Sequence, residues 1–165
     1  MPRLALSLIL ALLALAAPAL AQQDVQISFG HSLRLAGTAL EITADTLQVD
    51  QTTGASEFSG NVLAVQGEMR IAAQSLRLEY DPGETAGSRR ISVLRAAGGV
   101  TMVTPSEAIE AREVVYSLLT QTLEMSGEVM LVQGPNLLSG ERFVADLRAG
   151  TGRMIGRVRT IIRME

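Results

Sequence analysis

The decapeptide FSGNVLAVQG at residues 58–67 recurs as MSGEVMLVQG at residues 125–134, an offset of 67 positions. Both copies belong to a longer alignment without gaps, in which residues 42–80 match residues 109–147. Most aligned positions keep their apolar or polar character. An internal repeat of this size predicts a stack of similar units, each of which buries its apolar face only against its neighbours.

A shorter period lies inside this repeat. The pattern Ile-x-Ala-x-x-Leu-x-Val at residues 42–49 returns as Ile-x-Ala-x-x-Leu-x-Leu at residues 71–78. Weaker copies of a Gly-x-Val element occur at residues 98–100 and 156–158. The chain therefore consists of about four units, which we call rungs, each made of two strand-forming runs.

Short alternating runs of apolar residues, separated by turns containing Gly, Pro or Asn, predict β-strands throughout the repeat. The expected strands cover residues 40–49, 55–65, 69–80, 91–103, 109–117, 123–132, 136–147 and 154–164. Residues 105–119 would also fit a helix. Because this stretch aligns with a strand of the other copy, we assign it to a strand.

The phase of alternation shifts within each rung. Ile42 and Leu47 would lie on opposite sides of a strictly alternating strand. One extra residue near Asp45 returns both side chains to one side, as a β-bulge or corner does, and it also bends the sheet. The same shift separates Ala73 from Leu76. We therefore expect an all-β fold, a single folded antiparallel sheet of stacked two-strand rungs with an apolar interior.

The first residues are typical of a secretory signal peptide. Arg3 precedes an apolar run at residues 4–17, Pro18 breaks it, and Ala-Leu-Ala at residues 19–21 fits a cleavage site after Ala21. An uncleaved anchor is the alternative, but the run is shorter than the ~20 residues that span a bilayer. We expect an exported protein with a signal peptide (1–21), a leading segment (22–39) and one β domain (40–165).

Catalytic and metal sites find little support in the sequence. His31 is the only histidine and there is no cysteine, which argues against a zinc site or a Ser–His–acid triad. A hydrolase carboxylate pair drawn from Asp45, Asp50, Glu57 and Glu124 is one interpretation, but solvated faces and turns are the favoured one. No phosphate-binding loop occurs, and the net charge of −3 argues against nucleic-acid binding. We expect no catalytic residue, cofactor or metal.

The interior is the candidate functional surface. Its expected residues are mostly aliphatic, with several methionines, whose flexible side chains adapt to irregular apolar shapes. Alternation does not distinguish a filled core from a lined groove, so both interpretations stay open. The side chains expected to face inward are Ile42, Leu47, Val49, Phe58, Val62, Ile71, Leu76, Leu78, Val100, Met102, Val114, Tyr116, Met125, Val129, Leu131, Leu138, Phe143, Met154 and Val158.

The two ends of the stack are candidate interaction surfaces. Their outermost strands leave backbone groups unpaired, which invites strand addition by another copy or by a related domain. Arg157, Arg159 and Arg163 alternate with apolar residues in the last expected strand. Binding of a phosphorylated headgroup or an acidic partner is one interpretation of these arginines, but a solvated outer face that discourages aggregation is the favoured one.

Four segments together resemble the LptA (OstA-like) family of lipopolysaccharide transport. They are ITADTLQVD at residues 42–50, FSGNVLAVQG, LRLEYD at residues 76–81, and NLLSGERFVADLRAGTGR at residues 136–153. The resemblance covers about residues 40–164. It implies a folded β jelly roll, without enzymatic activity, whose interior residues bind lipid A acyl chains.

The resemblance also implies a location in the periplasm and a set of partners. An LptC-like inner-membrane protein would contact the N-terminal edge, an LptD-like outer-membrane protein the C-terminal edge, and further copies would associate head to tail. Two alternatives remain: a β-repeat scaffold without a lipid ligand, and an LptC-like member of the same pathway.

Overall fold

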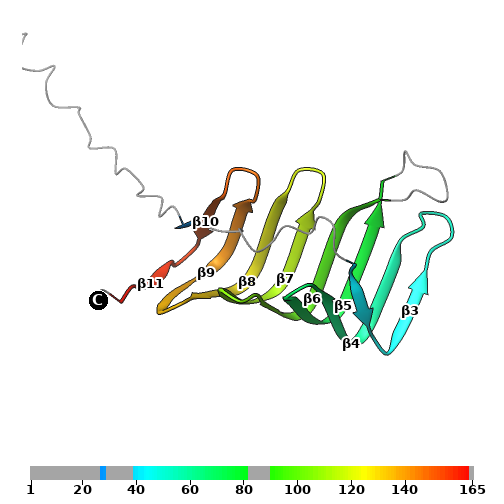
Figure 1. Ribbon diagram of the computed structural model, residues 1–165, viewed down its shortest axis with the longest axis horizontal. Coiled ribbons are helices and arrows are strands. Elements are labelled where there is room, and N and C mark those ends of the chain that lie inside the picture. Colours follow the sequence, from blue (N-terminus) through cyan, green and yellow to red (C-terminus); the bar gives the residue numbers. More distant parts are fainter. Residues whose placement is uncertain (1–26, 29–38, 82–89, 164–165) are drawn as a thin grey trace, which may run out of the picture.

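The fold is one antiparallel sheet in which nearly every strand pairs with its neighbour in sequence (Figure 1). The computed structural model describes residues 27–28, 39–81 and 90–163. None of these residues belongs to a helix long and apolar enough to cross a membrane. The strands are β1 (Ile27–Ser28), β2 (Glu41–Thr43), β3 (Thr46–Val49), β4 (Ser56–Gln66), β5 (Met69–Tyr80), β6 (Ile91–Val103), β7 (Glu107–Ser117), β8 (Thr122–Gln133), β9 (Asn136–Asp146), β10 (Thr151–Ile155) and β11 (Arg159–Ile161).

The sheet order is β1-β10-β9-β8-β7-β6-β5-β4-β2, with β3 also paired to β4 and β11 also paired to β9. The all-β prediction is therefore confirmed, and β5 and β6 begin and end at the expected residues. The first expected strand is divided into β2 and β3 where an extra residue was expected. The expected signal peptide, His31 and most of the leading segment lie outside the described residues.

Two details differ from the expectation. The last expected strand, residues 154–164, is divided into β10 and β11, because Gly156 (φ 78°) and Arg157 (φ 43°) adopt left-handed conformations that a continuous strand does not allow. In addition, β1 was not expected. It pairs with β10, so that Ile27 lies opposite Gly152 and Ser28 opposite Thr151.

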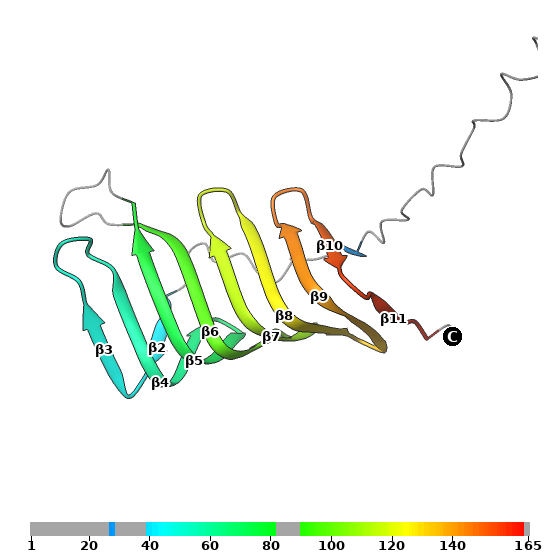
Figure 2. The ribbon, with the colours of Figure 1, turned by 180° about the vertical axis from the view of Figure 1, so that it is seen from behind.

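A bend at one level of every long strand folds the sheet into two walls (Figures 1 and 2). The register of each pairing shifts there, as β-bulges require. The shifts fall between Ser59 and Val62, Ala72 and Ser75, Ala97 and Val100, Glu110 and Glu113, and Ser126 and Val129. We call this line of bends the corner.

Each rung builds the corner in the same way. A glycine with positive φ lies beneath a side chain of the paired strand, so close that a Cβ atom would come within 3.0 Å of that side chain. The pairs are Gly60 with Asp45, Gly98 with Gln74, Gly127 with Arg112, and Gly156 with Glu141. The four-rung repeat therefore corresponds to four copies of one corner.

Two neighbouring glycines allow a test of this packing. Gly98 and Gly99 share a φ of 86°, but a Cβ on Gly98 would lie 2.6 Å from Gln74 Cβ, whereas a Cβ on Gly99 would meet nothing within 4 Å. Alanine at either position pays about 1–2 kcal/mol for the left-handed backbone. Only Gly98→Ala adds a steric clash of roughly 1–3 kcal/mol. Urea unfolding should therefore show a clearly larger loss of stability for Gly98→Ala, and equal losses would contradict the corner packing.

Candidate functional site

Rows of apolar side chains line the inner face of both walls. Residues directly opposite one another on paired strands project to the same face of a sheet. One row crosses the first wall through Leu47, Phe58, Leu76, Ala96, Val114, Met125, Phe143 and Met154. Another crosses the second wall through Ile42, Ala64, Ile71, Met102, Ile109, Leu131 and Leu138. Buried members of both rows belong to one hydrophobic cluster, so the two walls pack against each other.

Most residues that the sequence predicts to face inward lie in this cluster. The buried ones are Val62, Ile71, Leu76, Leu78, Val100, Met102, Val114, Met125, Val129, Leu131, Leu138 and Phe143. Ile42, Phe58, Tyr116 and Met154 are partly buried and pack against the cluster. The pattern of alternation therefore places these side chains on the correct face.

Three predicted residues are exposed, for two different reasons. Leu47 and Val49 are each 54% exposed, although their register opposite Phe58 and Ser56 puts them on the inner face. They lie on β3, which in the described chain pairs only with β4, so no further strand covers them. Val158 lies in neither β10 nor β11 and is 47% exposed, so the prediction of an inward strand position is wrong for it.

A small apolar cavity lies between the walls and opens partly to solvent, and the room it offers a water-sized molecule is about 20 Å³. Its lining consists of Met69, Ile71, Leu94, Met102, Val114, Tyr116, Leu123 and Leu147. A space of this size holds about one water molecule, so an acyl chain would enter it only if the two walls moved apart. Burial raises the pKa of the Tyr116 phenol, because an apolar environment disfavours its charged form.

Half of the cavity lining is absent from the predicted set. Leu94 continues the alternation of Val100 and Met102 and could have been found from it. Ile109, which lies in the inner row, aligns with Ile42 in the internal repeat and could also have been found. Met69 starts its strand and Leu147 follows the end of another, where alternation gives the weakest signal.

The carboxylates considered for catalysis do not come together. Glu57 pairs with Arg77 at 3.3 Å and Glu124 pairs with Arg142 at 2.7 Å. Asp50 accepts hydrogen bonds from the backbone N–H groups of the turn that follows it, and these bonds lower its pKa. Asp45 accepts a hydrogen bond at the corner. These positions on outer faces and in turns fit the solvated interpretation, and the described residues hold no cluster of three or more potential metal ligands.

Among the described residues, one carboxyl group is buried. Glu107 is 6% exposed; its Oε1 accepts a hydrogen bond from Gln133 Nε2 at 3.2 Å, and its Oε2 has no hydrogen-bond partner. Burial raises the pKa of Glu107, because an apolar environment disfavours the charged form. It stands apart from the carboxylates considered above and offers no catalytic pair.

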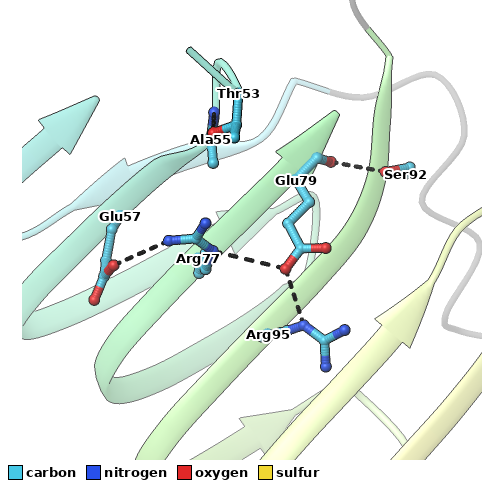
Figure 3. A network of polar contacts seen from close by, with 7 residues as sticks. All are labelled: Thr53, Ala55, Glu57, Arg77, Glu79, Ser92 and Arg95. Carbon is cyan, nitrogen blue, oxygen red and sulfur yellow. Dashed lines mark hydrogen bonds and ion pairs between the residues drawn. The ribbon is translucent and has the colours of Figure 1, made fainter. Parts of the chain in front are cut away.

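The outer face has the opposite character (Figure 3). Arg77 bridges Glu57 at 3.3 Å and Glu79 at 3.6 Å, and Arg95 contacts the same Glu79 carboxylate at 3.0 Å. Such partly exposed ion pairs contribute little to stability individually. They keep the outer face hydrated, so an apolar ligand would bind on the inner face.

Comparisons with known proteins agree with this architecture. Residues 41–151 match the model of a family described as LptA/(LptD N-terminal domain) LPS transport protein. An uncharacterized protein of Rhizobium meliloti (strain 1021) is 23% identical over 119 residues, which cover 70% of this chain and 64% of that protein. The chain thus spans less than two thirds of that relative's length.

A solved structure shows the same fold. It is the crystal structure of LptH from Pseudomonas aeruginosa, described as the LptA homologous periplasmic component of the lipopolysaccharide transport device. The superposition has a TM-score of 0.66 at 14% sequence identity and covers 76% of this chain and 96% of that one.

Proposed function

Because the chain belongs to the LptA/(LptD N-terminal domain) family of lipopolysaccharide transport proteins, which are not enzymes, we propose that it carries lipopolysaccharide with the acyl chains between its two walls. The observation that carries this proposal is the apolar interior shared by both walls, within which the accessible lining of the small cavity is wholly apolar. The inner rows on either side of it would extend the same path along the stack.

Burial of acyl chains supplies the binding energy. Each methylene that leaves water for an apolar site contributes about 0.8 kcal/mol. Met69 and Met102 lie at the cavity, and their flexible thioethers would adapt to chains of different shape. The phosphorylated sugars would stay outside, because the lining presents no charged group to compensate for the loss of their hydration. Because the cavity is small, acyl chains would require the walls to move apart about the corner.

The free edges of the sheet support a role in a periplasmic bridge. β2 and β3 pair only with β4 in the described chain, so one edge of each remains free for strand addition. Neighbouring strands are antiparallel throughout, and each rung adds two of them, so a second copy placed head to tail continues the alternation of directions. We assign an LptC-like partner to this N-terminal edge, an LptD-like partner to the C-terminal edge, and further copies to the positions between them.

Lipid analysis of the purified protein tests the proposal. The protein would be extracted from the cells that produce it, purified without detergent exchange, and examined by mass spectrometry for lipid A species. We expect lipid A to co-purify in amounts comparable to the protein, and not with an unrelated periplasmic protein treated in the same way. A lipid-free protein that still self-associates would favour the scaffold alternative instead.

A further inference from the structure

The two ends of the sheet carry opposite charges. The leading edge, residues 41–50 with β2 and β3, contains Glu41, Asp45 and Asp50 and no basic residue. The trailing edge, residues 151–163 with β10 and β11, contains four arginines and no acidic residue. The sequence therefore gives the stack an acidic start and a basic end.

The corner carries part of this charge at defined positions. In the first rung, Asn61 Nδ2 donates to Asp45 Oδ2 at 2.8 Å, and in the third rung Arg112 Nη2 donates to Glu128 Oε2 at 2.8 Å. In the last rung, the corresponding pair is Arg157 with Glu141. In each case the residue that follows the corner glycine reaches back to the side chain that covers this glycine.

The residue after each corner glycine lies a constant number of positions before the side chain that covers the glycine of the next rung. Positions 61 and 74, 99 and 112, and 128 and 141 are each 13 residues apart, and each pair spans a boundary between rungs. Arg157 occupies the last position of this series. In the described chain no further rung follows it, whereas a second copy stacked at this end would bring its first corner residue, Asp45, to that place.

Arg157 is well placed for such a contact. Its side chain is 93% exposed and its Nε lies 3.9 Å from Glu141 Oε1, at the outer limit of an ion pair. In the described chain, β1 covers the trailing edge only at Thr151 and Gly152, and β11 pairs only with β9, so this corner is open to a neighbour.

We propose that Arg157 of one copy pairs with Asp45 of the next, and that this corner contact sets the order and register of the junction between copies. This inference rests on the head-to-tail association in the proposed function. It adds the residue contact that favours this arrangement of copies over others. In the same register, Leu47 of the second copy extends the row that ends at Met154. Two leading edges brought together would instead oppose carboxylates, which disfavours head-to-head pairing.

Charge exchange at the two positions tests the contact. Asp45→Arg and Arg157→Asp each oppose like charges in a self-junction, and each should weaken self-association at least about tenfold in analytical ultracentrifugation. The double variant, or an equimolar mixture of the two single variants, should restore association, because opposite charges meet again. Both substitutions have a counterpart in the native chain. Arg112 already covers a corner glycine, as arginine would at position 45, and Asn61 is a short polar side chain at positive φ, as aspartate would be at position 157.

The outcomes separate this inference from lipid carriage. Circular dichroism verifies folding, and Arg157→Asn, which copies the first rung, is a milder second variant with an expected intermediate loss. Undiminished association of folded single variants, or a double variant that stays monomeric, would overturn the corner contact. A wild type that remains monomeric at millimolar concentration would overturn it too. Lipid that co-purifies equally with every variant leaves carriage supported in each case, whereas its absence from wild type contradicts carriage alone.

Discussion

Replacing Leu47 with aspartate should reduce the lipopolysaccharide that co-purifies with each chain at least about tenfold, because an unpaired carboxylate in contact with acyl chains loses its hydration. Leu47 lies at the open end of an inner row, directly opposite Phe58. Because its side chain is already 54% exposed, the charge should remain hydrated in the lipid-free protein, which should fold normally.

Thr46→Asp is the matched control. Thr46 precedes Leu47 on β3, is also exposed, and lies opposite Ser59 on the outer face. It adds the same charge to the same strand but directs it away from the interior, so bound lipid should stay near the wild-type amount. Mass spectrometry of lipid per chain makes the comparison, and equal lipid in both variants would contradict an inner path that begins at Leu47.

The largest loss of stability is expected for Phe143→Ala. Phe143 is 1% exposed, and its ring packs against Gly152 of β10 so closely that a Cβ there would clash. Truncating a fully buried phenylalanine costs about 3–5 kcal/mol, because a cavity remains. Folded domains are stable by only about 5–15 kcal/mol, so much of the stability would be lost.

Phe58→Ala is the natural comparison. Phe58 belongs to the same inner row, one strand from its open end, and is only partly buried. Its truncation should cost about 1–2 kcal/mol, since less apolar area leaves contact with its neighbours. Urea unfolding of the two variants measures the difference. If Phe58→Ala lost as much stability as Phe143→Ala, this would contradict the account that burial within the inner row increases with distance from the open end.

The internal repeat is the reason that so much of the fold could be predicted from sequence. It assigns residues 105–119 to a strand, and β7 (Glu107–Ser117) confirms this. It also identifies the bend near Asp45. The break at Gly156 and Arg157 was missed although residues 156–158 are a weak copy of the repeated Gly-x-Val element. Arg157 gives no composition signal of its own, and its correspondence with Asn61 and Glu128 reveals the positive φ. β1 lies outside the repeat and pairs with a strand far along the chain, so no local pattern indicates it.

The sequence predicts which side chains face the interior, but not how much space remains between the two walls. Alternation gives the face on which a side chain lies, and it placed Tyr116 and Met102 correctly. Whether two opposing rows fill the space between them depends on how their side chains meet across the walls, which no single strand encodes. Exposure at Leu47 likewise follows from its position on the last strand of the stack, a property of the whole sheet.

The central claim, that lipid lies between the walls, is tested most directly by photocrosslinking in living cells from two adjacent positions of β7. Tyr116 lines the cavity, whereas Val115 lies on the outer face opposite Arg95 and Glu124 and has a similar, intermediate exposure. A benzophenone side chain at position 116 should crosslink to lipopolysaccharide, and the same group at position 115 should not. Crosslinking that is equal at both positions, or found only at position 115, would contradict an interior lipid path.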